Sequence, residues 1–563
     1  MLLPSALAPD GSRVDGFSFE GRLTVTYHGE EPVDAGIRVE LELPETDDPS
    51  WLVPGLFYGE NRPASCTRVY PRFTPGGGDL GRMESDAWSF RADRCATPSV
   101  FARGGGLVTV ERSPLGQSGV GFAHRNRRPV IWLDFPYREE PLRYDGSEAP
   151  APPDVQTYRW SPGESVTLSV ERNDGDWRRV LRPRTDPPRS PAWVSIEGAA
   201  ELAAWGLYRW HYRADPPRLI ETAAFDRDAF GAHGDRDAMH VSWVSGTPYA
   251  YALLRHGRRV GNEAYVDAAT SVLDHIAANL TPGGTFWAQW TASKGWTTGW
   301  HPDHSRLHAR TLADATLFML RAGPPWEAAV RSNLDVARRT QREDGALPAA
   351  HHVGTGEAVA WEGTAGMAWI PPLVEAGYLD EARRAGEYYK GFDTYFGAPE
   401  DVDLAPTSED GYAAVMAYVA LEDWDAARRA ADWMLTFRYT YDVAFPPHTL
   451  LGTYGFRSRG ADQASPANQH LHAFGLICFP ELVRLARATG VEHYLQSARE
   501  NLACFRQFIA REDGDFDAYR GMASERYYQT DCFQAKGMLL TLSHAWSVGV
   551  LIYACEAALE LGV

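Results

Sequence analysis

Two glutamates stand where a pair of carboxyl groups could act together on one substrate. Glu362 follows Trp361 in the segment AVAWEGTAGMAWIPPLVEAG, and Glu525 lies in the segment GMASERYYQTD. Hydrolysis of a glycosidic bond needs two such groups, one as acid and one as base or nucleophile. Aromatic surroundings raise the pKa of a carboxyl group, as the acid role requires. Each glutamate is also compatible with an ordinary helix N-terminus, where the helix dipole favours negative charge.

Two aspartates offer the same chemistry. Asp410 stands in the segment TSEDGY at the start of a predicted helix, and Asp531 follows Glu525 in the same loop. The adjacent Glu409 would face another direction on a helix. We therefore predict Glu362 and Glu525 as the catalytic pair, with Asp410 and Asp531 as further candidates.

Aromatic and polar side chains gather in the same long loops. A pocket with apolar walls and a few convergent polar groups is the usual form of a ligand site, and aromatic faces suit sugar rings. A single loop tryptophan is more often a packing anchor. Five loops of this composition favour carbohydrate binding, with His470 and His472 expected to line the pocket from the tenth helix. The predicted substrate-binding residues are Trp287, Trp290, Trp300, His301, His304, Trp361, His470, Tyr528 and Arg457.

The histidines also invite a metal interpretation. His301, His304 and His308 are closely spaced, but Pro302 stands among them, at a predicted junction between loop and helix. A zinc ion needs three or four ligands in a fixed geometry, which such a junction does not favour. The six cysteines are scattered without a CxxC pair, which argues against a thiolate site. We expect neither a metal nor a cofactor.

Composition excludes several classes of function. The chain has 563 residues, of which 44% are apolar and 23% charged, as in ordinary globular proteins. A net charge of −19 argues against nucleic acid as the main partner. No apolar run reaches the ~18 residues of a membrane span, and the N-terminal MLLPSALAPDGSRVDG lacks the basic region of a signal peptide. We expect a cytoplasmic protein with a carbohydrate substrate.

The chain changes its periodicity once. Short alternating runs such as AGIRVELELP and PVIWLDFPY fill the first part and predict an antiparallel β-sandwich over residues 1–180. The proline-rich segment 181–193 has no periodicity and predicts a linker. Residues 194–563 follow a helical period.

The helical part predicts a ring of hairpins. Short turns alternate with long loops, so six hairpins closed into a double ring would place all the long loops on one face. An open α-solenoid that binds other proteins is the alternative. The predicted helices begin near Ile196, Val241, Asn262, His308, Pro325, Trp361, Tyr378, Ser408, Asp423, Asn468, Val491 and Ser543.

A β-sandwich, a short linker and a six-hairpin toroid resemble the (α/α)6 glycosidases, glucoamylase-type enzymes among them. Trp361–Glu362 is similar to the Trp-Glu-Glu segment that carries the general acid of that family. Ser524–Glu525–Arg526 looks like its Glu-Gln base segment, ahead of the last inner helix. The resemblance implies Glu362 as acid, Glu525 as base and inversion at the anomeric carbon. Gly363 and Arg526 depart from the family pattern, which leaves the sugar open.

Three other functions remain compatible with the same residues. A polysaccharide lyase would use Tyr or His as base and Arg to neutralise a uronate, although the order of the domains argues against it. A sugar epimerase or isomerase would use paired histidines, and a non-enzymatic protein would only bind carbohydrate. The residues available to a lyase are Asn468, His470, Tyr527, Tyr528, Arg457 and Arg459. We also expect segment 51–65 to reach the toroid mouth, with Tyr58, Asn61 and Arg62 at the rim.

Overall fold

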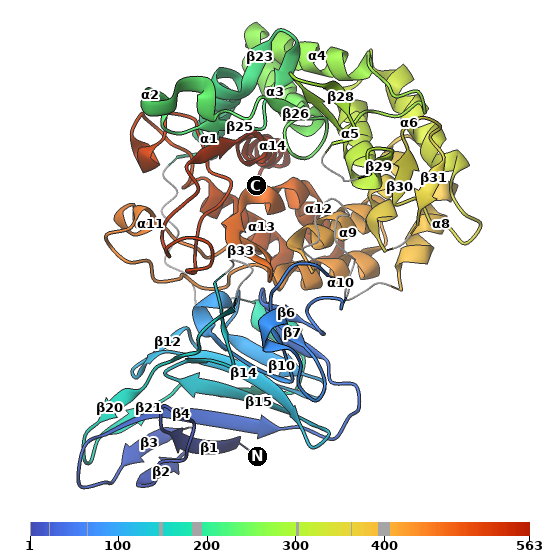
Figure 1. The fold of residues 1–563 in the computed structure, drawn as a ribbon. Helices are drawn as coiled ribbons and strands as arrows, with labels where there is room; N and C mark the ends of the chain where they lie inside the picture. The colour runs from blue at the N-terminus through green and yellow to red at the C-terminus, as the bar shows by residue number, and fades with distance from the viewer. Residues whose placement is uncertain are drawn as a thin grey trace.

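The computed structural model describes most of the chain. It covers residues 2–21, 23–64, 66–145, 150–182, 194–299, 303–361, 363–391 and 406–563, without the side chains of 229–232. Glu362, Trp300, His301 and most of the predicted linker 181–193 lie outside the described residues. Strands dominate up to residue 173 and helices from residue 196 onward (Figure 1).

Two larger antiparallel sheets, with several small ones beside them, form the described part of the N-terminal region. Along β4, Ile37, Val39 and Leu41 are buried, as expected when alternate side chains face one core. Between the sheets, Trp51 of β5 stacks on Phe122 of β14 at 4.5 Å, so the predicted sandwich is confirmed. One sheet has the order β1 (Leu2–Leu7), β4 (Val33–Glu42), β15 (Arg128–Phe135), β14 (Gly119–Arg125), β9 (Ala87–Arg91), with β20 (Tyr158–Trp160) also on β4. The other has the order β22 (Glu171–Asn173), β11 (Gly105–Val108), β10 (Ser99–Ala102), β5 (Trp51–Val53), β6 (Phe57–Tyr58).

Six inner helices close a ring. They are α3 (Thr247–Val260), α5 (Ala309–Ala322), α7 (Ile370–Glu375), α9 (Ser408–Ala420), α12 (Phe479–Thr489) and α14 (Ala545–Leu561). Each contacts the next, and α14 contacts α3. Their outer partners, in the same order, are α4 (Glu263–Ala277), α6 (Glu327–Arg339), α8 (Leu379–Tyr389), α10 (Trp424–Leu435), α13 (Glu492–Phe505) and α1 (Ile196–Gly206). The predicted toroid is confirmed, and the open solenoid is excluded because the ring closes.

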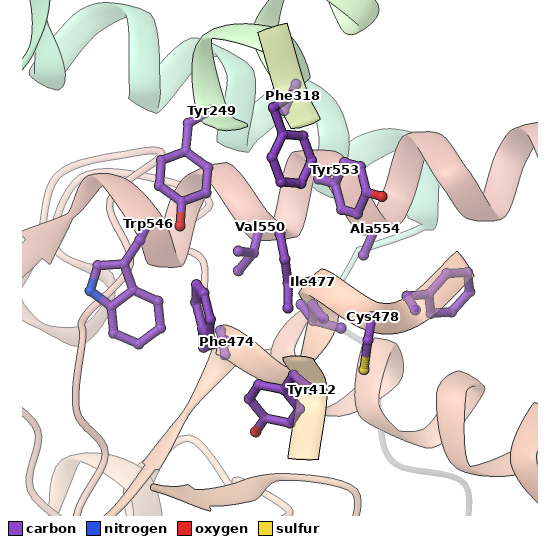
Figure 2. Packing of buried hydrophobic residues seen from close by; sticks show 14 of the residues in the cluster. Tyr249, Phe318, Tyr412, Phe474, Ile477, Cys478, Trp546, Val550, Tyr553 and Ala554 are labelled. Atoms are coloured by element: carbon purple, nitrogen blue, oxygen red, sulfur yellow. The ribbon is translucent and has the colours of Figure 1, made fainter. Parts of the chain in front are cut away.

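Side-chain pattern explains which helices are inner. The helix α14, AWSVGVLIYACEAALEL, is apolar on all sides and is buried up to Ala558. The outer helix α10 buries a stripe of alanines and exposes its arginines, as an amphipathic helix does. Figure 2 shows buried residues of this core, among them Tyr249, Phe318 and Tyr553 from the inner helices α3, α5 and α14. None of the described helices is both long and apolar enough to cross a membrane.

Three predicted helix starts are wrong. The segments at Val241, Trp361 and Asn468 are not helical, and the helical turns there begin at residues 247, 365 and 473. Short strands or turns occupy the residues between each predicted start and the observed one. The residues NQHLH, for example, pair with a neighbouring strand. His470 and His472 therefore lie on strand β33 (Asn468–His472), which pairs with β32 (Asp462–Ser465), and not on a helix.

Candidate active site

Four inner helices are each preceded by a short strand that ends in histidine. These strands are β26 (Ala238–His240), β29 (Arg306–His308), β33 (Asn468–His472) and β34 (Leu542–His544). Because neighbouring inner helices contact one another, the strands bring these histidines to the face where the inner helices begin. We call this face the mouth of the toroid.

Two of the histidines share one aromatic neighbour. The ring centroid of Trp546 lies 5.7 Å from that of His472 and 5.5 Å from that of His544. Phe474 packs against the same indole at 5.5 Å and reaches Trp243, whose ring lies 6.1 Å away. Figure 2 shows Trp546 and Phe474 side by side at the ring centre. Trp243, Phe474 and Trp546 therefore form an aromatic wall beside the histidines.

Burial lowers the pKa of three histidines at the mouth. It lowers the pKa of His472, and it lowers the pKa of His470 and His544 well below the ordinary value. The charge of Arg526 acts in the same direction on His470 and His544, whereas Glu409, Asp462 and Glu525 oppose the effect at His472. A neutral imidazole offers one donor and one acceptor nitrogen. Among the described residues, the buried Nδ1 of His544 has no hydrogen-bond partner.

An ion pair stands against the aromatic wall. Arg310, in the first turn of α5, pairs with Glu409 of α9, and its guanidinium lies 4.2 Å from the Trp243 centroid and 5.1 Å from that of Phe474. Tyr412 and Phe474 line a cavity of about 30 Å³ beside this pair. That volume suits a water molecule and is too small for a sugar.

Glu525 and Arg526 bring a second ion pair, in which Arg526 Nε lies 3.2 Å from Glu525 Oε1. Nearby, Glu221 is fully buried, accepts from Gln289 Nε2 at 2.7 Å and lies 3.0 Å from Arg236 Nε. Burial raises the pKa of Glu221, and the charge of Glu525 adds to that rise. Sequence reasoning missed Glu221 and Gln289, because pairing between distant strands brings them here.

Several predicted residues do join the mouth. Glu525, His470 and Tyr528 do so, because Ser524 pairs with Ser543 and Tyr527 pairs with Leu471, next to His544 and His470. Asp410 lies beside Glu409 in the first turn of α9; burial raises its pKa well above the ordinary value, and its Oδ2 has no hydrogen-bond partner among the described residues. Trp361 is half-buried just before Glu362, which is outside the described residues.

Asp531 is not brought to the mouth. Its carboxylate pairs with Arg91 of the sheet region at 2.9 Å. Trp290 is also directed elsewhere, because alternate residues of β27 (Gln289–Thr291) point to opposite faces. Gln289 reaches Glu221, whereas Trp290 packs under Arg218, 4.8 Å from its centroid.

His304 is exposed in a turn, and Arg457 forms a 3.3 Å ion pair with Asp442. Trp287 is half-buried, and among the described residues no ring contact joins it to the aromatic wall. Trp300 and His301 lie outside the described residues.

Segment 51–65 meets the toroid only in part. The hydroxyl of Tyr58 lies 2.8 Å from Thr436 Oγ1 at the end of α10. Asn61 and Arg62 instead turn into the sheet region, where they donate to the carbonyl groups of Pro71 and Tyr70. Both residues nevertheless line, together with Pro406 and Trp433 of the toroid, a cavity of about 390 Å³ between the sheet region and the start of α9.

The described residues contain no group of three or more His, Cys, Asp or Glu side chains that could hold a metal. Among the described residues, the buried imidazoles of His240, His472 and His544 lie beside the aromatic wall, with Arg–Glu pairs around them. Such a set can transfer protons and bind hydroxyl groups.

No protein-family model matches the chain, and no curated protein matches it in sequence. The helical region has the six-hairpin (α/α)6 fold. Solved structures with similarity include a D-mannose isomerase (14% identity, TM-score 0.46, 67% of this chain and 100% of that one). A cellobiose 2-epimerase from Bacillus thermoamylovorans has 11% identity and a TM-score of 0.43 over 64% and 99%. A polysaccharide lyase has 9% identity and a TM-score of 0.46 over 100% and 92%. At these identities the likeness concerns the fold alone.

Proposed function

We propose that the protein is a carbohydrate-active enzyme that epimerises or isomerises a neutral sugar at the toroid mouth, with His472 and His544 as the acid–base pair. The observation that carries this proposal is their shared neighbour, Trp546, within 6 Å of both imidazoles. A sugar bound beside this indole would lie next to two groups that can transfer protons, the imidazoles of His472 and His544. Removal of a proton from a sugar carbon, followed by delivery to the opposite face of that carbon or to the neighbouring carbon, is the chemistry of sugar epimerases and isomerases respectively.

The neutral state of both imidazoles supports this assignment. A general base must be unprotonated at the working pH, and burial lowers the pKa of both histidines. The ring that takes the proton from carbon becomes an imidazolium, which can return that proton to the neighbouring carbon of the enediol to give the ketose. A C2 epimer requires the second imidazole to deliver its own proton to the opposite face of the same carbon while the first ring keeps the proton it removed. A carboxyl group would be the expected acid for hydrolysis, whereas imidazole suits reversible proton transfer at neutral pH.

The charge of the mouth favours a neutral sugar. Each of its arginines stands beside a carboxylate: Arg310 with Glu409, Arg526 with Glu525, and Arg236 with Glu221. A lyase needs a free cation to neutralise a uronate. Arg457 and Arg459 are the other predicted arginines that a lyase could use. These two pair with Asp442 and Glu500, away from the mouth.

The test is turnover of neutral aldoses and disaccharides in D₂O, followed by NMR and mass spectrometry. We expect deuterium at a sugar carbon together with a new epimer or ketose. His472→Asn and His544→Asn should each lower the rate at least ~100-fold, while His304→Asn, at an exposed position, should match the wild type. Unchanged turnover in both mouth variants would overturn the proposal.

Glycoside hydrolysis is the second candidate, favoured by the environments of two carboxyl groups. Glu221 is fully buried with a raised pKa, whereas the nearby Glu525 side chain is 21% exposed beside Arg526. A buried carboxyl group with a raised pKa can act as the general acid of a glycosidase, with a second carboxyl group beside it as base or nucleophile. New reducing ends without deuterium at carbon, abolished by Glu525→Gln, would favour this candidate over the first. Growth of absorbance near 230 nm would instead indicate a lyase, which creates a conjugated double bond.

A further inference from the structure

A buried serine holds one ring nitrogen of His472. Ser408 is the first residue of α9 and is fully buried. Its Oγ lies 3.0 Å from His472 Nε2 and 3.2 Å from the carbonyl oxygen of Ala464. A serine hydroxyl has one proton to donate. The Tyr412 side chain is a third hydrogen-bonding neighbour of this hydroxyl. Ser408 can donate to only one neighbour at a time, and the choice determines where the proton of the imidazole lies.

The strand pairing beside His472 decides that choice. In the β32–β33 ladder, Asp462 pairs with His472 and Gln463 with Leu471, but the next pair is Ser465 with Asn468. Ala464 falls in this irregularity and has no ladder partner, so its carbonyl group needs another donor. A carbonyl oxygen can only accept. Ser408 therefore donates to Ala464 and accepts from the Nε2–H of His472.

We propose that Ser408 is a positioning residue that holds His472 with its proton on Nε2 and its lone pair on Nδ1. The role of that lone pair as proton acceptor rests on the function proposed above. Tyr412 also approaches Nε2, but at 3.4 Å its hydroxyl is the more distant neighbour. The opposite tautomer would set the Nε2 lone pair against the Ser408 oxygen lone pairs.

The charges around His472 leave this arrangement in place. Glu409, Asp462 and Glu525 stabilise a protonated ring, and Arg310 and burial oppose them. Burial is the strongest of these influences, so the ring is neutral and has a single proton. One nitrogen must then be a donor and the other an acceptor, which is the condition for a serine to select between two tautomers.

Nitrogen-15 NMR of the histidine-labelled protein tests the inference without any substrate. The His472 signals are assigned by their loss in His472→Gln. We expect Nε2 to be the protonated, pyrrole-type nitrogen and Nδ1 the pyridine-type nitrogen. Ser408→Ala should mix the two tautomers, whereas Ser408→Thr, which keeps the hydroxyl, should preserve the wild-type pattern.

Ser465→Ala is the matched control. Ser465 borders the same irregularity, and its buried hydroxyl has no hydrogen-bond partner among the described residues. This variant should leave the His472 signals unchanged. A wild-type proton on Nδ1, or equal shifts in Ser408→Ala and Ser465→Ala, would overturn the inference.

Kinetics separate this inference from the proposed function. Ser408→Ala should lower kcat about tenfold or more and change KM less than twofold, because the serine does not touch the sugar. Recovery of kcat in Ser408→Thr would support positioning over a general loss of structure. If the tautomer is as expected but the wild type converts no sugar, the proposed function fails and the role of Ser408 stands. If sugar conversion needs His472 but is the same in Ser408→Ala, the positioning role fails and the proposed function stands.

Discussion

Arg94 donates from Nη1 to the side-chain oxygen of Gln469 at 3.0 Å, which ties the sheet region to the residue just before His470. The same nitrogen lies 2.9 Å from Cys532 Sγ, in the loop that carries Glu525. Arg94 is itself held by the carboxylate of Glu139 in the sheet region. One buried guanidinium therefore connects the sandwich to two of the segments that form the mouth. The N-terminal region is in this sense part of the scaffold of the site.

Arg94→Met should strongly destabilise the protein. The substitution leaves the carboxylate of Glu139 buried without its main partner, since both side chains are at most 2% exposed. Loss of one partner of a buried ion pair costs about 3–5 kcal/mol. Urea denaturation measures the change. Arg127→Ala is the control, because its pair with Asp47 is 66% and 77% exposed and should contribute less than ~1 kcal/mol. A loss in Arg94→Met no larger than in this control would contradict the expectation.

The ring of helices could be predicted from the sequence because the pattern of each helix depends on local residues. An apolar segment such as 545–558 must be surrounded, and an alanine-striped segment such as 424–435 must pack on one side. The alternation of short and long loops then favours a closed ring of helical hairpins. The same reasoning locates Glu525 and His470 near the inner-helix starts.

The remainder of the site depends on contacts between distant segments. Strand β34 pairs with β25 (Thr222–Ala224), so His544 stands opposite Thr222, the neighbour of Glu221. No local pattern reveals such a pairing, and Glu221 is therefore absent from the predicted site. A histidine recurs in the sequence just before inner helices. Its place in the site becomes clear only from the short strands, which the helical periodicity does not predict.

Glu409→Gln should shift sugar preference toward anionic ligands. The substitution removes one of the carboxylates that pair with Arg310, while Asp314 Oδ2 remains 3.7 Å from its Nε and the guanidinium stays against Trp243 and Phe474. A charge-assisted hydrogen bond from Arg310 to a sugar carboxylate then becomes available. Calorimetric titration should show glucuronate-ended disaccharides gaining up to about tenfold in affinity relative to glucose-ended ones, or ~1.4 kcal/mol.

The surface variant Glu422→Gln is the control for this experiment. Glu422 is 68% exposed and lies near Arg484, away from the mouth. It should leave the preference unchanged. An unaltered ratio of the two affinities in Glu409→Gln would show that Arg310 does not contact the bound sugar.

Acid should weaken the fold through His351. Burial lowers the pKa of His351 to about 4, below the ~6.5 of an unfolded chain. The unfolded state therefore binds the proton first, so this contribution to stability is complete above pH 6.5 and is lost as the pH falls toward 4. Between pH 7 and pH 5 the loss is about 2 kcal/mol. Urea denaturation at the two pH values should show a smaller difference for His351→Gln than for the wild type. The exposed His304→Gln should keep the wild-type difference, and an equal difference in both variants would rule out this assignment.

Two glycines of α1 should respond in opposite ways to alanine. A Cβ on Gly206 would lie 1.9 Å from the carbonyl oxygen of Gly521, and this neighbour is backbone that cannot turn aside. Overpacking of this kind costs about 1–3 kcal/mol. Because Gly521 begins the segment that leads to Glu525, Gly206→Ala should lower both the melting temperature and the turnover of sugar.

Gly198→Ala provides the matched comparison within the same helix. The nearest atom to its Cβ would be Ser195 Oγ at 3.4 Å, so the methyl group fits. Alanine is a better helix former than glycine by roughly 0.5–1 kcal/mol, which should raise the melting temperature and leave turnover unchanged. If both variants melt alike, close packing of α1 against residue 521 does not limit stability. If Gly206→Ala melts lower but keeps full turnover, the loop before Glu525 tolerates displacement of its first residues.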